Sequence, residues 1–424
     1  MLCDVIAAPG TVSTHPLTRA PSPEALLAAL AHRDRPVMVP FRDHVVVACD
    51  PVEVVDGSDV WDALAVSCRR RSDGPTAAAG GWIGLLGYDL GGSVEHLPEP
   101  HADPGGPPLA TVARYETVAI FDPYGGCVIA GVGGAAECRQ LAETATRAVA
   151  PAPHRVSPVD VTPSLTASEY RARVDAAREL IRAGDCYQVN LTQRLTAPWN
   201  AGPIAFAANL WAAAGASSHR AYVGLHGGAV VSASPERLVR VVDGVAESEP
   251  IKGTAALGEW EQLSTSAKDR AEHVMIVDLV RNDLGRVATA GGVSVPRIFS
   301  YLSTPYVEHM VSEVRATLRA EVTATDVLRA VFPGGSVTGT PKVRAMEVIR
   351  ELEPVSRGPA FGSVVAVGSD GAIEASITIR TAWVTANEVR YWCGGAVVWD
   401  SDPEAERLEA WAKAHPFLRA VGVL

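Results

Sequence analysis

The chain has 424 residues and is 47% hydrophobic, enough to bury a large core in one two-layer domain or in two ordinary ones. Its formal net charge is −11, and its longest run of Lys or Arg is three residues, too short to offset this charge. Nucleic acid is therefore not an expected partner.

The seven cysteines are scattered and form no CxxC pair, which argues against a disulfide framework or a zinc cage. The N-terminus has no signal-peptide pattern, and the chain has no stretch of about 18 apolar residues that would span a bilayer. We expect reduced thiols in a soluble cytoplasmic protein.

The first 150 residues alternate short β-branched runs with turn residues, a pattern typical of strands. Two further stretches have helical composition, and the Pro-rich segment that follows is typical of a connection. We expect an N-terminal region over 1–150 packed on the core, a linker over 151–164 and a second domain over 165–424. The predicted strands lie within 44–49, 80–90, 110–122 and 126–132, and the predicted helices within 23–32 and 135–149.

The second part of the chain begins with a well-marked helix. Thr166 and Glu169 form a capping box, apolar residues recur at helical spacing, and Gly184 stands where a C-terminal cap belongs. Strands and helices then occur in runs without strict βαβ alternation, which favours an α+β fold with largely antiparallel sheets. The predicted elements are strands at 187–196, 221–226, 228–234 and 237–244 and a helix at about 265–288.

Two predicted helices each present a row of charged side chains. Asp269 and Glu272 share one face of the first helix, and Glu406, Glu409 and Lys413 share one face of a helix that Asp402 would cap. Either set could be a solvated surface with an i,i+4 Glu–Lys pair. Alternatively, the two helices face each other and cage a hard cation such as Mg²⁺.

The segment FPGGSVTGTPKVRAMEVIREL, residues 332–352, leads through glycines into a helix, with Thr340 as a natural N-cap. Backbone N–H groups at such an entrance form an anion site, which Lys342 would reinforce. The alternative is a tight turn with no ligand.

Several single residues have two possible roles, one in a ligand-binding or catalytic site and one purely structural. Gly394 and Gly395 lie within a strand pattern and would let a ligand approach the backbone or mark a bulge. Arg380 suits a carboxylate ligand or an internal ion pair. Lys252, just before a glycine, is a nucleophile if unprotonated and otherwise a turn lysine, and His309 is a catalyst or a packed histidine.

From about Thr166 to His415 the sequence resembles the chorismate-binding domain shared by the large subunits of anthranilate and aminodeoxychorismate synthases and by isochorismate and salicylate synthases. The N-terminal WIGLLGYDLGGSVEHLP is similar to the corresponding half of the aminating subunits. The resemblance implies an anthranilate-synthase-like fold of two stacked, mainly antiparallel sheets with helices outside and the site between them. The matching motifs are AGDCYQVNLTQR, SASPERL, PIKGT, KDRAEHVMIVDLVRNDLGRV, HMVSEV, GGSVTGTPKVRAMEVIRELEP, SITIRT and GGAVVWDSDPEAERLEAWAKA.

The resemblance also implies roles for individual residues. Glu272 and Glu409 match magnesium ligands, with Asp269 and Glu406 as outer partners. Lys252, His309 and Glu272 match catalytic positions. The substrate-binding positions implied are Gln188, Ser336, Thr338, Arg380, Gly394, Gly395 and Lys413.

Two positions select a branch of this family. The water-using members carry a lysine base where this chain has Gln188, which favours the aminating branch. Anthranilate synthases resemble PIAGT, whereas aminodeoxychorismate synthases resemble the PIKGT of this chain, which implies that Lys252 attacks the substrate ring. Anthranilate synthase remains the nearest alternative, and a non-catalytic chorismate-fold protein that binds a partner is a more distant one.

Two departures from the aminating branch stand out. The chain reads GTAALGEW where that branch commonly has basic residues, and Glu249 stands where water-using members place a general acid. No glutaminase motif is present, so we expect ammonia from a separate glutamine amidotransferase subunit and a separate lyase downstream. The product, 4-amino-4-deoxychorismate, would be used to make 4-aminobenzoate and folate or a secondary metabolite.

Overall fold

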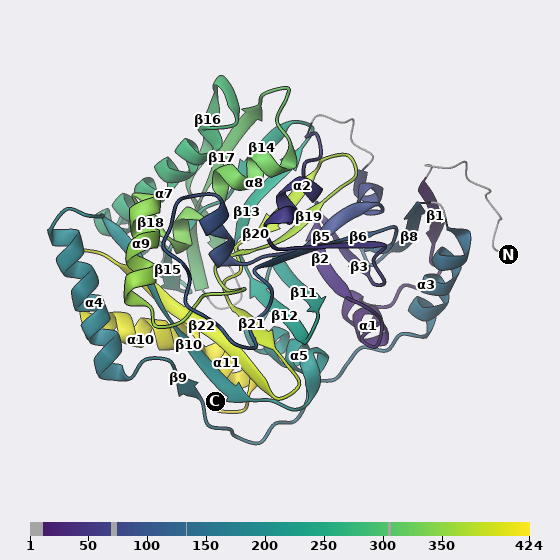
Figure 1. Ribbon diagram of the computed structural model, residues 1–424, viewed down its shortest axis with the longest axis horizontal. Helices are drawn as coiled ribbons and strands as arrows, with labels where there is room; N and C mark the ends of the chain where they lie inside the picture. The colour runs from purple at the N-terminus through teal and green to yellow at the C-terminus, as the bar shows by residue number, and fades with distance from the viewer. Residues whose placement is uncertain (1–11, 69–73, 133, 304–306) are drawn as a thin grey trace.

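The computed structural model describes residues 12–68, 74–132, 134–303 and 307–424. Its strands form two large sheets, and every described strand pair is antiparallel. Helices pack around the sheets, as Figure 1 shows. The predicted α+β class with antiparallel sheets is therefore confirmed.

The first sheet has twelve strands, and it begins with strands from the N-terminal part of the chain. A short strand, β9 (Thr162–Pro163), pairs with β10 beside the main order. In spatial order the other strands are β1 (Val12–Pro16), β8 (Cys127–Val132), β7 (Thr117–Phe121), β3 (His44–Ala48), β2 (Val37–Phe41), β11 (His219–Leu225), β12 (Gly228–Ser234), β21 (Thr381–Val384), β22 (Glu388–Val397), β10 (Gln188–Pro198) and β18 (Gly339–Thr340).

The second sheet has ten strands, and the long β16 (Ala288–Ser303) pairs with β17 beside the main order. In spatial order the others are β15 (Ile251–Ala256), β17 (Val307–Leu318), β14 (Val245–Ser248), β13 (Arg237–Val242), β20 (Ile373–Ser376), β19 (Ser363–Val367), β5 (Gly81–Leu86), β6 (Ala110–Tyr115) and β4 (Glu53–Asp56).

The N-terminal strands are built into both sheets. In the first sheet β2 pairs with β11, and in the second β5 pairs with β19 along five residue pairs. Residues before 150 therefore supply part of each layer.

Alternation along the strands divides the hydrophobic core into two clusters. Val37, Val39 and Phe41 of β2 join a cluster that contains residues of both sheets and so lies between them. Met38, between Val37 and Val39 in the chain, belongs to a second cluster formed with residues of the covering helices. The period of two thus buries both faces of the first sheet.

Helices cover the sheets and carry part of the predicted site. Helix α7 packs on β15, β16 and β17, whereas α10 packs on β22 and α4. The helices are α1 (Pro23–Ala29), α2 (Val60–Ala63), α3 (Ala135–Arg147), α4 (Ala167–Arg182), α5 (Gly202–Ala214), α6 (Trp260–Thr265), α7 (Ala267–Gly285), α8 (Ala324–Val331), α9 (Lys342–Leu352), α10 (Pro403–Lys413) and α11 (His415–Ala420), with short 3₁₀ turns η1 (Gly57–Asp59), η2 (Gly74–Ala78), η3 (Tyr88–Ser93) and η4 (Gly335–Val337).

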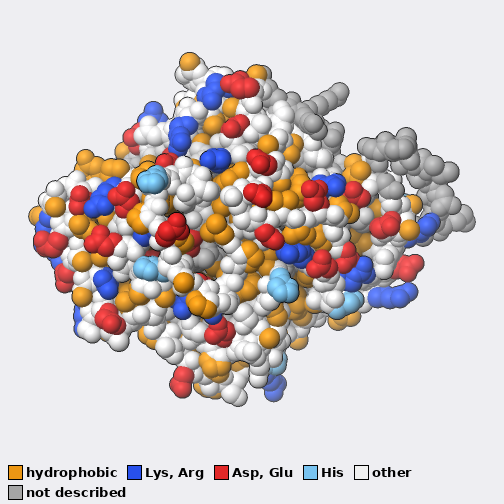
Figure 2. Space-filling view, viewed as in Figure 1, with side chains coloured by type: hydrophobic (Ala, Val, Ile, Leu, Met, Phe, Trp, Pro, Cys, Tyr) orange, Lys and Arg blue, Asp and Glu red, His pale blue; other side chains and the backbone are white. Residues whose placement is uncertain are grey.

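The predicted N-terminal caps of two helices, α4 and α10, are confirmed. The Thr166–Glu169 capping box opens α4, and the Asp402 side chain accepts hydrogen bonds from the Glu404 and Ala405 N–H groups at the start of α10. Within the described parts of the chain, no helix is long and apolar enough to cross a membrane. The face in Figure 2 shows acidic and basic side chains interspersed.

Candidate functional site

Lys252 lies on β15 and is surrounded by charges from several elements. It is partly buried and stands opposite Met310 of β17. Burial lowers the pKa of its amine, as does the nearby Lys413 ammonium, while Glu272, Glu236 and Glu409 oppose this shift. The lowered pKa favours the unprotonated, nucleophilic amine.

The carboxylates near Lys252 come from opposite sides. Glu272 is on α7, whose N-cap Ser266 binds the backbone N–H of Asp269, one turn before Glu272. Glu409 is on α10. The structure therefore places one carboxylate of each helix near Lys252.

On α10 the charged side chains form a short row. The Ser401 hydroxyl donates to Glu406 Oε1 at 2.6 Å, and Lys413 Nζ lies 2.7 Å from Glu409 Oε1. The i,i+4 Glu–Lys pair expected of a solvated helix surface therefore exists, and both of its members act on the charge of Lys252.

The two glycines of β22 have different reasons to lack a side chain. A Cβ on Gly394 would lie 2.1 Å from the carbonyl oxygen of Leu191 on β10. A Cβ on Gly395 would lie 3.1 Å from Glu406 Oε2 and 3.7 Å from Glu409 Oε1. Gly394 thus permits strand packing, and Gly395 leaves room beside the α10 carboxylates.

This carboxylate set has the chemistry that a hard divalent cation prefers, namely oxygen ligands beside an open approach. Among the residues that the structure describes, no three His, Cys, Asp or Glu side chains already converge on one metal position. The magnesium site stays a prediction.

The glycine-rich segment before α9 differs in detail from the prediction. Thr340 is not the N-cap of α9, because its backbone is paired with Gln188 in β18, and Pro341 occupies the cap position. The Lys342 ammonium is already paired within the protein, because its Nζ donates to Asp283 Oδ2 at 2.6 Å. The hydroxyl of the fully buried Thr338 donates to the Gly334 carbonyl.

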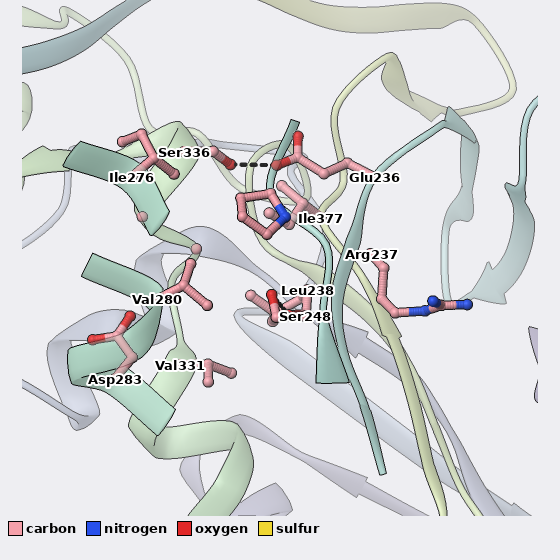
Figure 3. Close-up of a pocket in the computed structure, with 13 residues that line it drawn as sticks. Glu236, Arg237, Leu238, Ser248, Ile276, Val280, Asp283, Val331, Ser336 and Ile377 are labelled. Carbon is pink, nitrogen blue, oxygen red and sulfur yellow. Dashed lines mark hydrogen bonds between the residues drawn. The ribbon is translucent and has the colours of Figure 1, made fainter. Parts of the chain in front are cut away.

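Glu236, between β12 and β13, is a site residue that the sequence reading missed. It is 5% exposed, and Ser336 Oγ donates to its Oε1 at 2.7 Å, as the dashed line in Figure 3 shows. Burial raises its pKa to about 7, although the Ser336 hydrogen bond and Lys252 partly oppose this. The signal in the sequence was an acidic residue within the apolar strand pattern SASPERLVRV.

Glu236 and Ser336 line a small cavity together with apolar side chains such as Ile276 and Val280 of α7. Its volume is about 20 Å³, room for one water molecule. Arg237 extends away from the cavity in Figure 3. Its guanidinium instead pairs with Glu374 and Glu249.

Gln188 and His309 are both buried near this region. Gln188 is fully buried, and among the residues that the structure describes neither its amide oxygen nor its amide nitrogen has a hydrogen-bond partner. Such a buried amide is costly unless a ligand or water satisfies it. His309 is 5% exposed, and burial, followed by the nearby Arg380 charge, lowers its pKa.

Arg380 does not lie within a strand as expected. It stands at φ 50° between β20 of one sheet and β21 of the other, where the chain crosses between layers. The Arg380 carbonyl accepts a hydrogen bond from Ala233 N on β12. The crossing takes the residue out of both ladders and next to His309.

Comparisons with known proteins show the family to which the chain belongs. Residues 39–419 match the family model described as chorismate binding enzyme. The chain belongs to the chorismate-binding enzymes. It is 39% identical over 385 residues to the aminodeoxychorismate synthase component 1 of Salmonella typhimurium, covering 89% of this chain and 84% of that protein.

Relatives of a neighbouring branch are also similar to this chorismate-binding enzyme. The anthranilate synthase component 1 of Streptomyces coelicolor is 35% identical, with 81% of this chain and 73% of that protein covered. The crystal structure of anthranilate synthase component I from Streptococcus pneumoniae aligns with a TM-score of 0.74 at 27% identity, over 98% of this chain and 93% of that one. The anthranilate-synthase-like fold is thereby confirmed.

One departure from the aminating branch is explained by the geometry of this chorismate-binding enzyme. Glu249 Oε2 lies 2.6 Å from Arg237 Nη1, and its other oxygen lies 3.4 Å from Arg297 Nη2. Glu249 and Ile251 line a second cavity, whereas Ser248 and Pro250 line the Glu236 cavity. Glu249 therefore faces away from Glu236.

The raised pKa of Glu236 gives a pH-dependent stability. Its folded-state pKa of about 7 exceeds its ordinary 4.5, so its contribution is present at low pH and lost as pH rises through 7. Glu236→Gln removes this loss. We expect the unfolding free energy of the variant, relative to wild type, to rise by about 2 kcal/mol between about pH 5.5 and about pH 8.5 in thermal denaturation.

Glu374→Gln is the matched control for that measurement. Burial opposes ionisation of Glu374, but His219 and Arg237 outweigh it and lower its pKa. Its contribution is therefore present throughout the tested range, and the variant should show a constant deficit. A flat difference for Glu236→Gln as well would contradict a raised pKa.

The two glycines should respond differently to a methyl group. Gly394→Ala places a Cβ against backbone and should destabilise the protein by about 1–3 kcal/mol or more. Gly395→Ala meets only side-chain ends and should change the unfolding free energy by less than about 1 kcal/mol. Chemical denaturation of both variants measures this, and equal losses would show that Gly395 is also needed for packing.

Proposed function

We propose that this enzyme converts chorismate and ammonia into 4-amino-4-deoxychorismate, with Lys252 as the nucleophile. The observation that carries the proposal is a partly buried lysine of lowered pKa between carboxylates of α7 and α10. The similarity to aminodeoxychorismate synthase component 1 supports the same reaction.

Lys252 needs a proton acceptor before it can attack. The charge of Lys252 acts on Glu236, whose pKa is about 7. Near neutral pH the Glu236 carboxylate can therefore take the proton from the Lys252 ammonium. Ser336 fixes this carboxyl group by a hydrogen bond. In this proposal Glu236 is the group that accepts the Lys252 proton before substrate binds.

Covalent catalysis then divides the reaction into two displacements. The Lys252 amine forms a C–N bond to the ring while the C–O bond of the 4-hydroxyl breaks and that oxygen leaves with a proton as water. Ammonia next forms a C–N bond at the 4-position, and the bond to lysine breaks. The amine is regenerated, and the enolpyruvyl group stays on the product.

Magnesium would be held by Glu272 and Glu409, with Asp269 and Glu406 as outer partners. The fit rests on the oxygen donors of these carboxylates and on the space that Gly395 leaves beside two of them. When bound, the ion would neutralise substrate carboxylate charge and assist departure of the hydroxyl.

The remaining substrate contacts follow from charge and position. Arg380 and Lys413 supply cationic groups suited to the two carboxylates of chorismate. His309, with its lowered pKa, would be neutral at pH 7 and able to donate or accept a hydrogen bond. Gln188 offers its unpartnered amide, which is neutral and cannot deprotonate water as a lysine base would.

Ammonia would come from a separate glutamine amidotransferase subunit in the cytoplasm, as the name "component 1" of the relatives suggests. A separate lyase would complete 4-aminobenzoate for folate synthesis or for a secondary metabolite. Anthranilate synthesis is the second candidate, because relatives of that name reach 35% identity. The Lys252 environment favours the first.

The decisive test is the product formed by the purified chain from chorismate, Mg²⁺ and ammonium, measured by mass spectrometry. Wild type should yield aminodeoxychorismate without pyruvate, and intact-protein mass should reveal an adduct. Lys252→Ala should lose at least about 100-fold in rate or shift toward anthranilate, and should form no adduct.

Lys252→Arg is the matched control, because it keeps a positive charge but not a nucleophilic amine. It should fail as Lys252→Ala does if nucleophilic attack matters. Anthranilate with pyruvate, or isochorismate, as the main wild-type product would assign the enzyme to another branch.

A further inference from the structure

One edge of β10 is closed by side chains where no strand lies beside it. On that edge β18 pairs with Gln188 and Val189, and β9 pairs with Leu195 and Thr196. Between these short partners, residues 190–192 still have backbone groups that must be satisfied. This gap begins two residues after Gln188, a predicted substrate-binding residue.

An ion pair at the end of α9 fills the gap. Arg357 Nη2 donates to the Asn190 carbonyl at 2.5 Å, and Nη1 donates to the Val337 carbonyl at 2.7 Å. Glu353 Oε1 accepts from Thr192 N at 2.8 Å and from Thr192 Oγ1 at 2.9 Å. Arg357 Nε and Nη2 also donate to Glu353, at 2.9 and 2.6 Å. The pair thus replaces a strand.

The same pair fixes the loop that carries two predicted substrate contacts. Val337 lies between Ser336 and Thr338, and the Thr338 carbonyl accepts from Asn190 N at 2.8 Å. Loop and strand are therefore joined by one backbone bond and by the two arms of one guanidinium. Only the planar fork of arginine can reach both carbonyls and Glu353 at once.

The pair is deeply buried. The side chains of Arg357 and Glu353 are 1% and 3% exposed, and the rings of Tyr88 and Phe361 lie 4.4 and 4.8 Å from the guanidinium carbon. A buried ion pair is a poor source of stability compared with apolar packing of the same volume. Its use at this place therefore calls for a reason beyond stability.

We propose that Glu353 and Arg357 are positioning residues that hold the 335–338 loop and the Gln188 end of β10 in one fixed arrangement. The catalytic part rests on the proposed function, because the loop and Gln188 act only if they contact substrate. The mechanical part, that the pair fixes this edge, can be measured without substrate.

The experiment compares Arg357→Lys with Arg42→Lys in the full chain. Arg42 forms another ion pair, with Asp370 at 2.5 Å, in which the two side chains are 11% and 2% exposed. It joins the β2–β3 and β19–β20 turns, which carry no predicted site residue. Both changes keep a positive charge and lose the fork. Arg357→Lys should lower kcat/KM for chorismate about 10-fold or more, whereas Arg42→Lys should stay within about two-fold at a similar loss of Tm.

Hydrogen exchange measured by mass spectrometry gives the readout that needs no substrate. Peptides covering 188–193 and 335–341 should exchange faster in Arg357→Lys than in wild type and be unchanged in Arg42→Lys. Thr192→Val, which removes one bond to Glu353 and keeps the side-chain volume, should show the same effect at smaller size. It also decides the question if Arg357→Lys does not fold.

The outcomes separate the two proposals. Equal activity and equal exchange in the Arg357 and Arg42 variants would overturn the positioning role. A wild-type product other than aminodeoxychorismate would overturn the proposed function, while the exchange comparison would still decide whether the pair fixes this edge.

Discussion

A lysine amine held partly out of water is the constraint on which this site depends. Burial alone would lower the pKa of Lys252, and the nearby Lys413 adds to this, so carboxylates must balance the charge. Glu236, Glu272 and Glu409 supply that balance from three different parts of the fold. The two sheets and their helices must therefore place these three carboxylates around the Lys252 amine.

The N-terminal region takes part in this constraint indirectly. Its strands β2 and β5 are hydrogen-bonded into the two sheets, so they fix the layers that carry the site. Tyr88, just after β5, covers one face of the Arg357 guanidinium, and its N–H donates to the Gly358 carbonyl. The N-terminal region therefore supports the edge of β10.

Local signals in the sequence predicted local structure well, and distant pairings account for the rest. The capping box at Thr166 and the cap at Asp402 depend on a few adjacent residues and are both confirmed. Thr340 has the composition of a cap, but its backbone is paired with β10, which no local pattern reveals. Lys342 is likewise taken by Asp283, 59 positions away.

In the candidate site, too, local signals were predicted from the sequence and contacts between distant residues were not. Periodicity correctly placed Glu272 and Glu409 on helix faces, but only the fold shows that both approach Lys252. Glu236 was missed because its role depends on burial beside Ser336, a residue 100 positions away. The substrate positions are predicted from family resemblance, and the structure adds that Gln188 is a buried amide with no partner among the described residues.

In the proposed reaction ammonia, rather than water, is the second nucleophile, and the charge at two positions supports this choice. Gln188 is neutral, so it can hydrogen-bond a nucleophile but cannot remove a proton from water. Glu249, which is acidic, is held by Arg237 and Arg297 beside the second cavity and faces away from Glu236. The proposed reaction therefore uses nucleophiles that need neither Gln188 nor Glu249 as a base. The Lys252 amine, with its lowered pKa, and ammonia are such nucleophiles.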